Sequence, residues 1–141
     1  MKRQKNPLKN EKGFTLIEII AVLVILGILA AVAVPKYMDL QNQARIKSAQ
    51  AAIAEVKARL SNGYGQYLLK NNGTAPTTIA ALCGTNGIND ATIMPVNGVG
   101  TVPMGDDYLV KTTVSTNVAT ITVSKVQNVA TTVPAATWTV P

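Results

Sequence analysis

The chain contains no histidine and only one cysteine, and these two shortages exclude most kinds of catalytic and metal site. Its 141 residues include Cys83 as the single cysteine. Without histidine, the chain has no Ser/His or Cys/His nucleophile pair and no HExxH zinc motif. Without a second cysteine, it has no CxxC redox pair and no intramolecular disulfide. We therefore predict that the chain is not an enzyme, binds no metal and carries no cofactor.

Charged residues are also scarce, at 14% of the chain, and their positive excess lies at the N-terminus. The formal net charge is +6, but five basic residues and one acidic residue fall within the first thirteen positions. Residues 14–141 hold eight basic and six acidic residues, so their net charge is only +2. Because this balance does not predict a general polyanion-binding surface, we predict no specific nucleic-acid partner.

The longest apolar run follows this basic segment. Residues 14–34 read FTLIEIIAVLVILGILAAVAV, twenty-one residues with one charge, Glu18. At about 1.5 Å per residue, a helix of this length crosses a hydrocarbon core of about 30 Å. A secretory signal peptide is the rival interpretation, but its apolar region usually spans only about 7 to 15 residues. We therefore predict a single-pass membrane helix over residues 14–35. Its N-terminus should lie in the cytoplasm, because basic residues precede the apolar run.

Beyond residue 35 the apolar residues become periodic. They recur at spacings of three and four, which is the stripe of an amphipathic helix: Ile46, Ala49, Ile53, Val56 and Leu60. We predict that this helix covers residues 36–62, continues the membrane helix, and stops at Ser61-Asn62-Gly63. Two positions weaken the helix before it: Pro35 lacks a backbone donor, and Gly27 has a low helix propensity.

The C-terminal part contains two regions of different amino-acid composition. Residues 63–107 are rich in glycine, proline and asparagine and predict a loop region, with a short helical turn at 78–82. Four segments rich in threonine, valine and isoleucine then predict strands at 108–114, 118–124, 125–133 and 137–140, the last at a sheet edge. The expected fold is α+β: an antiparallel sheet of three to four strands over 108–140 packs on the long helix and completes a globular domain of residues 36–141.

The segment KGFTLIE at 12–18, followed by a long apolar helix with Gly27 and Pro35, resembles the N-terminus of type IV pilins and the related pseudopilins. The resemblance is specific over residues 12–37 and only architectural beyond them. It implies that residues 1–13 are a leader peptide. A prepilin peptidase would cut between Gly13 and Phe14 and methylate the new amino group of Phe14.

The same resemblance implies a structural role. The chain would be a major pilin that polymerises into a helical filament of identical copies, with an inner-membrane assembly platform as a further partner. The precursor would span the inner membrane, and the mature chain would form a surface pilus, or fimbrium, used for adhesion, twitching motility or DNA uptake. A pseudopilin of a type II secretion or competence system is the alternative. A second alternative is a bitopic membrane protein that never polymerises and presents an extracytoplasmic binding domain.

Glu18 is the residue that this resemblance explains best. A charge inside an apolar helix is costly and is usually paired or functional. We expect Glu18 of one copy to meet the Phe14 amine of a neighbouring copy in the filament. The alternative is a contact between Glu18 and the Phe14 amine of its own chain, four residues away. The family also implies a locally melted helix between Gly27 and Pro35.

Two features depart from the family or stay open. Many type IV pilins close their C-terminal region with a disulfide, whereas this chain has only Cys83, which we expect to be buried near the short helical turn. Asp106 and Asp107 could supply oxygen ligands for calcium, although adjacent aspartates in a glycine-rich turn are more often plain turn residues.

Overall fold

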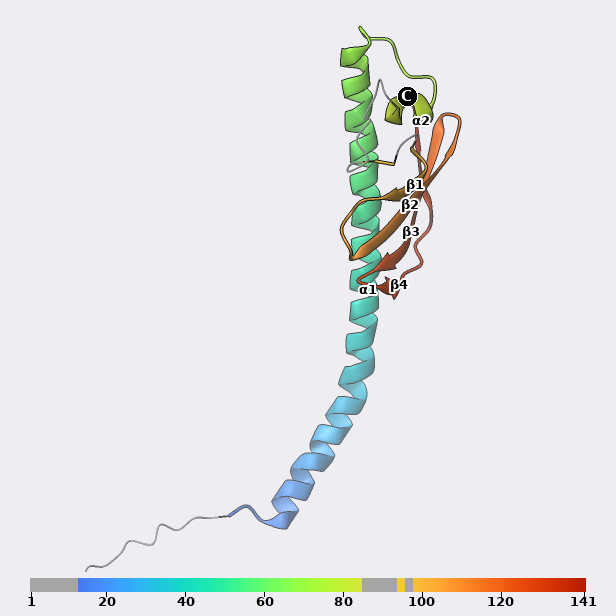
Figure 1. Ribbon diagram of the computed structural model, residues 1–141. Helices are drawn as coiled ribbons and strands as arrows, with labels where there is room; N and C mark the ends of the chain where they lie inside the picture. The colour runs from blue at the N-terminus through green and yellow to red at the C-terminus, as the bar shows by residue number, and fades with distance from the viewer. Residues whose placement is uncertain (1–12, 85–93, 96–97) are drawn as a thin grey trace, which may run out of the picture. The chain divides into compact units, whose positions relative to one another are not determined.

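The computed structural model describes residues 13–84, 94–95 and 98–141 (Figure 1). Within these residues, two helices are followed by five strands. The elements are α1 (Leu16–Lys70), α2 (Ile79–Cys83), β1 (Gly100–Val102), β2 (Tyr108–Ser115), β3 (Val118–Val126), β4 (Val129–Ala130) and β5 (Ala136–Thr139). The predicted α+β fold is therefore confirmed, with five strands in place of three to four.

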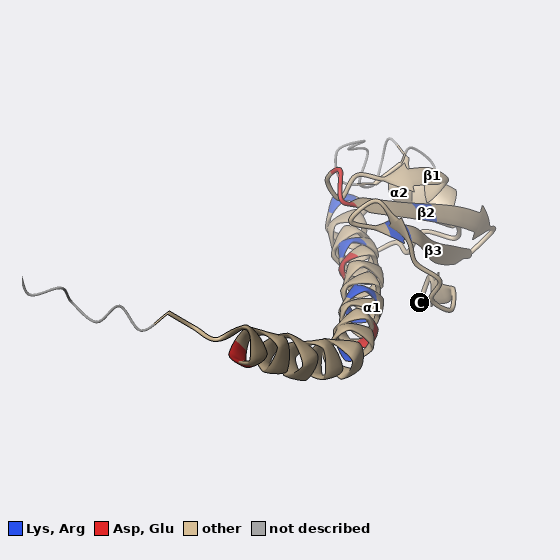
Figure 2. Ribbon diagram, turned by 90° about the horizontal axis from the view of Figure 1, so that it is seen from below, with Lys and Arg blue, Asp and Glu red and all other residues tan. Residues whose placement is uncertain are grey.

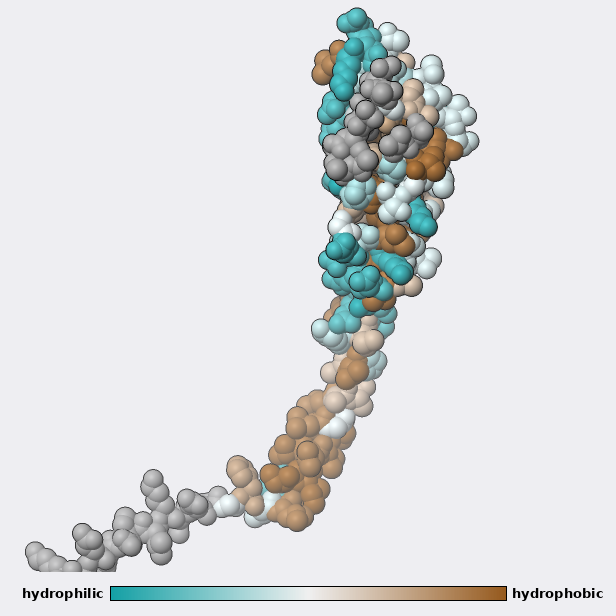
Figure 3. Space-filling view, in the orientation of Figure 1, coloured by the Kyte–Doolittle hydropathy of each residue, from teal (hydrophilic) through white to brown (hydrophobic). Residues whose placement is uncertain are grey.

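The chain divides into two compact units, Met1–Leu40 and Gln41–Pro141. We call them the helical unit and the globular unit. In the helical unit every described residue from 13 to 40 is exposed, and the chain is helical from Leu16 onward. By length and composition alone, α1 is long and apolar enough to cross a membrane, as the sequence predicts. Figure 3 shows the apolar surface of this unit, while polar residues dominate the surface of the globular unit.

Helix α1 ends at Lys70, eight residues later than the predicted end at 62. Ser61-Asn62-Gly63 does not stop the helix, because Gly63 is buried and Tyr64 and Tyr67 extend the core-facing stripe. The stop comes at Asn72 and Gly73, whose φ angles are 50° and 83°. There the Gly73 N–H donates to the Leu68 carbonyl at 2.8 Å and satisfies one of the last helical acceptors.

The sheet of the globular unit is antiparallel, with strand order β1-β2-β3-β4 and with β5 paired to β3. Two residues, Thr116 and Asn117, connect β2 to β3 between the paired Ser115 and Val118. Among the described strands, β5 pairs only with β3, so the prediction of an edge strand at the C-terminus is confirmed.

Three parts of the predicted sheet and loop region differ from the structure. Strand β3 continues through Val126, and Gln127 and Asn128 then reverse the chain with φ angles of 51° and 59°. A two-residue turn with both angles positive is the usual hairpin connection, so the predicted strand at 125–133 contracts to the short β4. Helix α2 and strand β1 lie inside the predicted loop of residues 63–107, where α2 matches the expected helical turn and β1 was missed.

The core of the globular unit lies between one face of the sheet and the two helices. Its buried members from α1 include four of the five predicted stripe residues, whereas Ile46 is 38% exposed. They pack with Ile79, Leu82 and Cys83 of α2 and with alternate residues of the strands: Val102, Val110, Ala119, Ile121, Val123 and Val126. The expected burial of Cys83 is confirmed, and this burial raises the pKa of its thiol to about 11.

Hydrogen bonds fix the segments around this core without a disulfide. The buried Thr112 hydroxyl donates to the Gly98 carbonyl at 2.5 Å, and Gly98 has a φ of 75°. Ser48 of α1 and Tyr108 of β2 share a hydroxyl–hydroxyl bond of 2.6 Å. The Trp138 indole N–H donates to the Ser61 hydroxyl at 3.0 Å and holds β5 against α1.

Candidate functional site

The first turn of α1 is closed by a reciprocal pair, Thr15 and Glu18. The backbone N–H and the hydroxyl of Thr15 donate to Glu18 Oε2 at 2.7 and 2.8 Å. The Glu18 N–H faces the Thr15 hydroxyl at 3.4 Å. A threonine at the N-cap with a glutamate three residues later is a capping box, which satisfies donors that a helix start leaves free. Glu18 therefore has a structural role before any assembly.

Thr15 is the residue that sequence reasoning missed. Its signal was present, because Thr-x-x-Glu directly before an apolar run predicts a helix start. Among the described residues, the partner of Glu18 within the chain is Thr15 and not Phe14. The Phe14 side chain is 84% exposed, and Gly13 is exposed beside it. The carboxylate and the predicted cleavage site thus lie together at the start of the helix. The contact with a new Phe14 amine stays a prediction.

Beyond this capping box, the helical unit presents an apolar surface that nothing in the described chain covers. Figure 2 shows the acidic residue at the start of α1, followed by turns without charge. The exposed side chains are large and aliphatic over more than four turns: Leu16, Ile17, Ile19, Ile20, Val22, Leu23, Val24, Ile25, Leu26, Ile28, Leu29, Val32 and Val34. An apolar face this large marks a surface that contacts lipid or protein.

Gly27 and Pro35 both lie within α1, which is helical through both positions. A Cβ atom added to Gly27 would meet no atom within 4 Å. Packing inside the chain therefore does not require glycine there. The predicted weakening of the helix between these residues stays a prediction.

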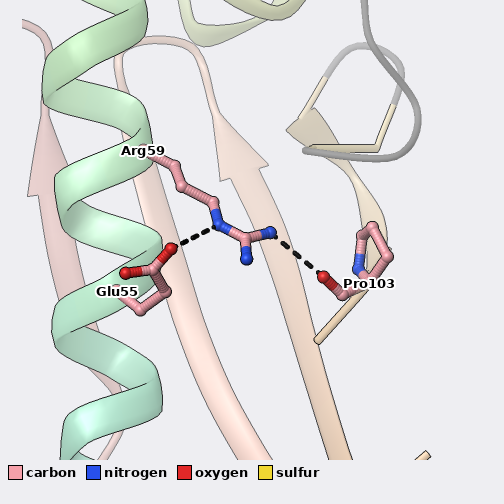
Figure 4. A network of polar contacts seen from close by, with 3 residues as sticks. All are labelled: Glu55, Arg59 and Pro103. Carbon is pink, nitrogen blue, oxygen red and sulfur yellow. Dashed lines mark hydrogen bonds and ion pairs between the residues drawn. The ribbon is translucent and has the colours of Figure 1, made fainter. Parts of the chain in front are cut away.

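One ion pair of the globular unit joins Glu55 and Arg59, four residues apart on α1. Figure 4 shows Arg59, which pairs with Glu55 at 2.9 Å and donates to the Pro103 carbonyl at 3.0 Å. This contact holds the turn between β1 and β2 against α1. The same turn carries Asp106 and Asp107, both exposed. Among the described residues, no group of three or more His, Cys, Asp or Glu side chains could hold a metal ion.

Comparison with known proteins connects the capping box to a family motif. A model of the prokaryotic N-terminal methylation motif matches residues 8–34. The chain is 51% identical over 47 residues to the type IV narrow pilus major component PilA5 of Thermus thermophilus, covering 33% of this chain and 40% of that protein. It is 35% identical over 106 residues to the type IV major pilin protein PilE of Neisseria gonorrhoeae, covering 72% and 60%. The chain is a homologue of type IV pilins.

This pilin homologue is also similar to pseudopilins. It is 48% identical over 52 residues to the type II secretion system core protein G of Pseudomonas aeruginosa, covering 37% of each chain. The chain spans less than two thirds of the length of each of these three relatives. No solved structure shows a significant match. The matched motif includes Gly13, Phe14, Glu18 and Gly27, whereas Pro35 lies one residue beyond it.

Proposed function

We propose that the chain is the precursor of a major pilin, a structural subunit that polymerises through α1 into a type IV pilus. The observation that carries this proposal is the apolar surface of the helical unit, fully exposed, with Glu18 at its start. A lone membrane anchor would need such a surface, but it would not need a carboxylate inside the motif that pilins share. The relatives include major pilin and fimbrial proteins, and we propose no enzymatic activity.

The proposed maturation begins at the cytoplasmic face of the inner membrane. A prepilin peptidase removes residues 1–13, cutting between Gly13 and Phe14, and methylates the amino group of Phe14. The apolar helix of residues 14–35 holds the chain in the membrane, and the globular domain of residues 36–141 lies outside. An assembly platform in the inner membrane then adds the subunit to a filament that reaches the cell surface. There the pilus would serve adhesion, twitching motility or DNA uptake.

Cleavage gives Glu18 a second partner. Both hydrogen bonds from Thr15 reach Oε2, and among the described residues none reaches Oε1. The carboxylate can therefore keep its cap and still accept an ammonium group at the free oxygen. We propose that this group is the Phe14 amine of a neighbouring copy, since the apolar core of a filament makes an unpaired charge expensive.

Gly27 and Pro35 have a separate proposed role in the filament. The helix between them would loosen when copies pack, because glycine and proline stabilise helical backbone least. The open space around Gly27 agrees with this role, since no contact inside the chain restrains it.

A pseudopilin of a type II secretion or competence machine is the second candidate. The N-terminal helix cannot separate the two, because both kinds of relative match it. The extent of the matches favours the pilin: PilE aligns over 106 residues, whereas the core protein G of Aeromonas hydrophila aligns over 70. A bitopic protein that never polymerises is the weakest candidate, because it gives Glu18 no partner beyond its cap.

The experiment is to shear fibres from the native host and measure the mass of their main protein. The expected species is residues 14–141 with one methyl group on Phe14. Two variants then separate capping from pairing. Glu18→Gln keeps an acceptor for the Thr15 N–H but removes the charge, and Glu18→Leu removes both. We expect both variants to be processed and neither to give fibres. Wild-type fibre yield from Glu18→Gln would leave Glu18 with the capping role alone.

A further inference from the structure

Arg45 of α1 has an incomplete set of partners in the globular unit. Its Nη1 donates to Asn42 Oδ1 at 3.3 Å. Its Nε is shielded from solvent and has no acceptor among the described residues. No described carboxylate lies within ion-pair distance of it. A buried donor without an acceptor is unfavourable, so this conformation leaves the guanidinium able to gain from a new partner.

The surroundings of Arg45 suit an anion. The side chain lies between two hollows, one of about 310 Å³ beside the β3–β4 turn and one of about 140 Å³ beside β4. The larger hollow is lined by Gln41, Ala44, Arg45, Ser48, Val126 and Gln127. This lining offers amide, hydroxyl and guanidinium donors and no carboxylate. A guanidinium binds a carboxylate through two parallel hydrogen bonds, which makes a carboxylate the best-matched occupant.

We propose that Arg45 binds the carboxylate of Asp39 from a second copy of this chain. The proposal rests on the proposed function, because it requires the filament. Asp39 is exposed on α1 and has no hydrogen bond or ion pair among the described residues. Glu18 and Glu55, in contrast, already bond to Thr15 and Arg59. Asp106 and Asp107 are exposed too, but they lie in the turn beside Pro103 and not on the helix through which copies would pack.

The proposed contact defines a stagger between copies. Asp39 precedes Arg45 by six residues of α1, which is about 9 Å of helical rise. Parallel copies staggered by that amount would bring Arg45 of one copy level with Asp39 of the next.

The experiment is a charge exchange in the full-length chain. Arg45→Asp and Asp39→Arg are made singly and together, and sheared fibre is weighed against the amount of chain in the membrane. Each single variant is expected to lose fibre roughly tenfold or more, because like charges then face each other across copies. The double variant is expected to restore most of the yield. Lys47→Asp is the matched control. Among the described residues, the Lys47 Nζ hydrogen-bonds only to Gln50 Oε1, at 3.5 Å, so this variant should assemble as wild type does.

The outcomes separate the two proposals. Loss in both single variants with recovery in the double variant supports the Arg45–Asp39 contact, because a damaged fold would not be repaired by a second charge on the helix. Loss without recovery overturns it while leaving the pilin proposal intact, and so does normal assembly of either single variant. Wild-type cells that yield no fibre protein starting at Phe14 overturn both.

Discussion

The helical unit and the globular unit differ in the exposure of the apolar side chains of α1. In the helical unit α1 exposes its aliphatic side chains, and in the globular unit α1 buries Ala49, Val56 and Leu60 under the sheet. Side-chain burial stabilises the globular unit from within, whereas the helical unit has backbone hydrogen bonds but no core. The comparison teaches that the apolar side chains of the helical unit are not buried within the described chain; under the proposed function, lipid and then other copies would bury them.

The largest expected effect comes from a charge placed in the helical unit. Leu26→Lys should abolish membrane retention or assembly, since a lysine at the centre of a membrane helix costs about 2.5 to 3.5 kcal/mol on insertion scales. Membrane fractionation of the full chain measures it. Leu26→Ile is the control. Normal retention and normal fibre yield of Leu26→Lys would contradict the assignment of this surface to lipid and filament.

A large-to-small change should destabilise the globular unit and leave its stability unchanged when it is made in the helical unit. Leu60 is fully buried, and Leu60→Ala should lower the free energy of unfolding of the globular unit by about 2 to 5 kcal/mol. Leu23 is 62% exposed, and Leu23→Ala should leave that free energy unchanged. Thermal unfolding of the full chain in detergent compares them. Equal effects would mean that the helical unit has packing partners of its own.

Two glycines sharpen the same contrast. A Cβ at Gly98 would lie 2.7 Å from Ile79 Cγ2, and its φ of 75° strains any side chain. Gly98→Ala should therefore cost about 1 to 3 kcal/mol of stability. Gly27→Ala meets open space and should strengthen the helix by about 1 kcal/mol. Thermal unfolding measures the effect of Gly98→Ala, and helical circular dichroism measures the effect of Gly27→Ala. A loss of helix in Gly27→Ala would contradict the difference between the two glycines.

The two N-caps give a smaller effect. Thr15 caps α1 through Glu18, and Thr78 caps α2 by accepting from the Ala81 N–H at 3.0 Å. Replacing either threonine with alanine should cost about 1 kcal/mol. Thr15→Ser keeps the hydroxyl and is the control. Amide hydrogen exchange in detergent should show faster exchange confined to the first turn of the affected helix. Exchange spread along α1 in Thr15→Ala would mean that the cap supports more than its own turn.

The smallest effect concerns Cys83 and pH. Burial raises the pKa of its thiol from 9.0 to about 11, so the folded globular unit favours the protonated form. Its contribution to stability is therefore complete below pH 9 and is lost as the pH rises toward 11. Alkylation of the full chain at pH 8 should be much slower than alkylation of the unfolded chain. Equal rates would contradict the burial of the thiol.

The sequence predicted most of this architecture because its signals were local and strong. The apolar run, the helical stripe and the threonine-rich strands identify α1, β2, β3 and β5 by their periodicity. Prediction from the sequence failed where packing overrides local preference. Gly63 stays helical because the core continues past it. Strand β1 exists because Val102 pairs with Val110 of β2. Thr15 could have been found from its spacing to Glu18. The hollow beside Arg45 could not, because no sequence pattern shows that the β3–β4 turn lies beside α1.

The burial of the only thiol has a consequence for how the protein matures. The globular unit reaches its packed state through side-chain packing and hydrogen bonds such as the one between Thr112 and Gly98. Folding of the globular unit therefore requires no oxidant and no disulfide-exchange enzyme. While this unit stays folded, its buried thiol is also shielded from forming a disulfide with a second copy.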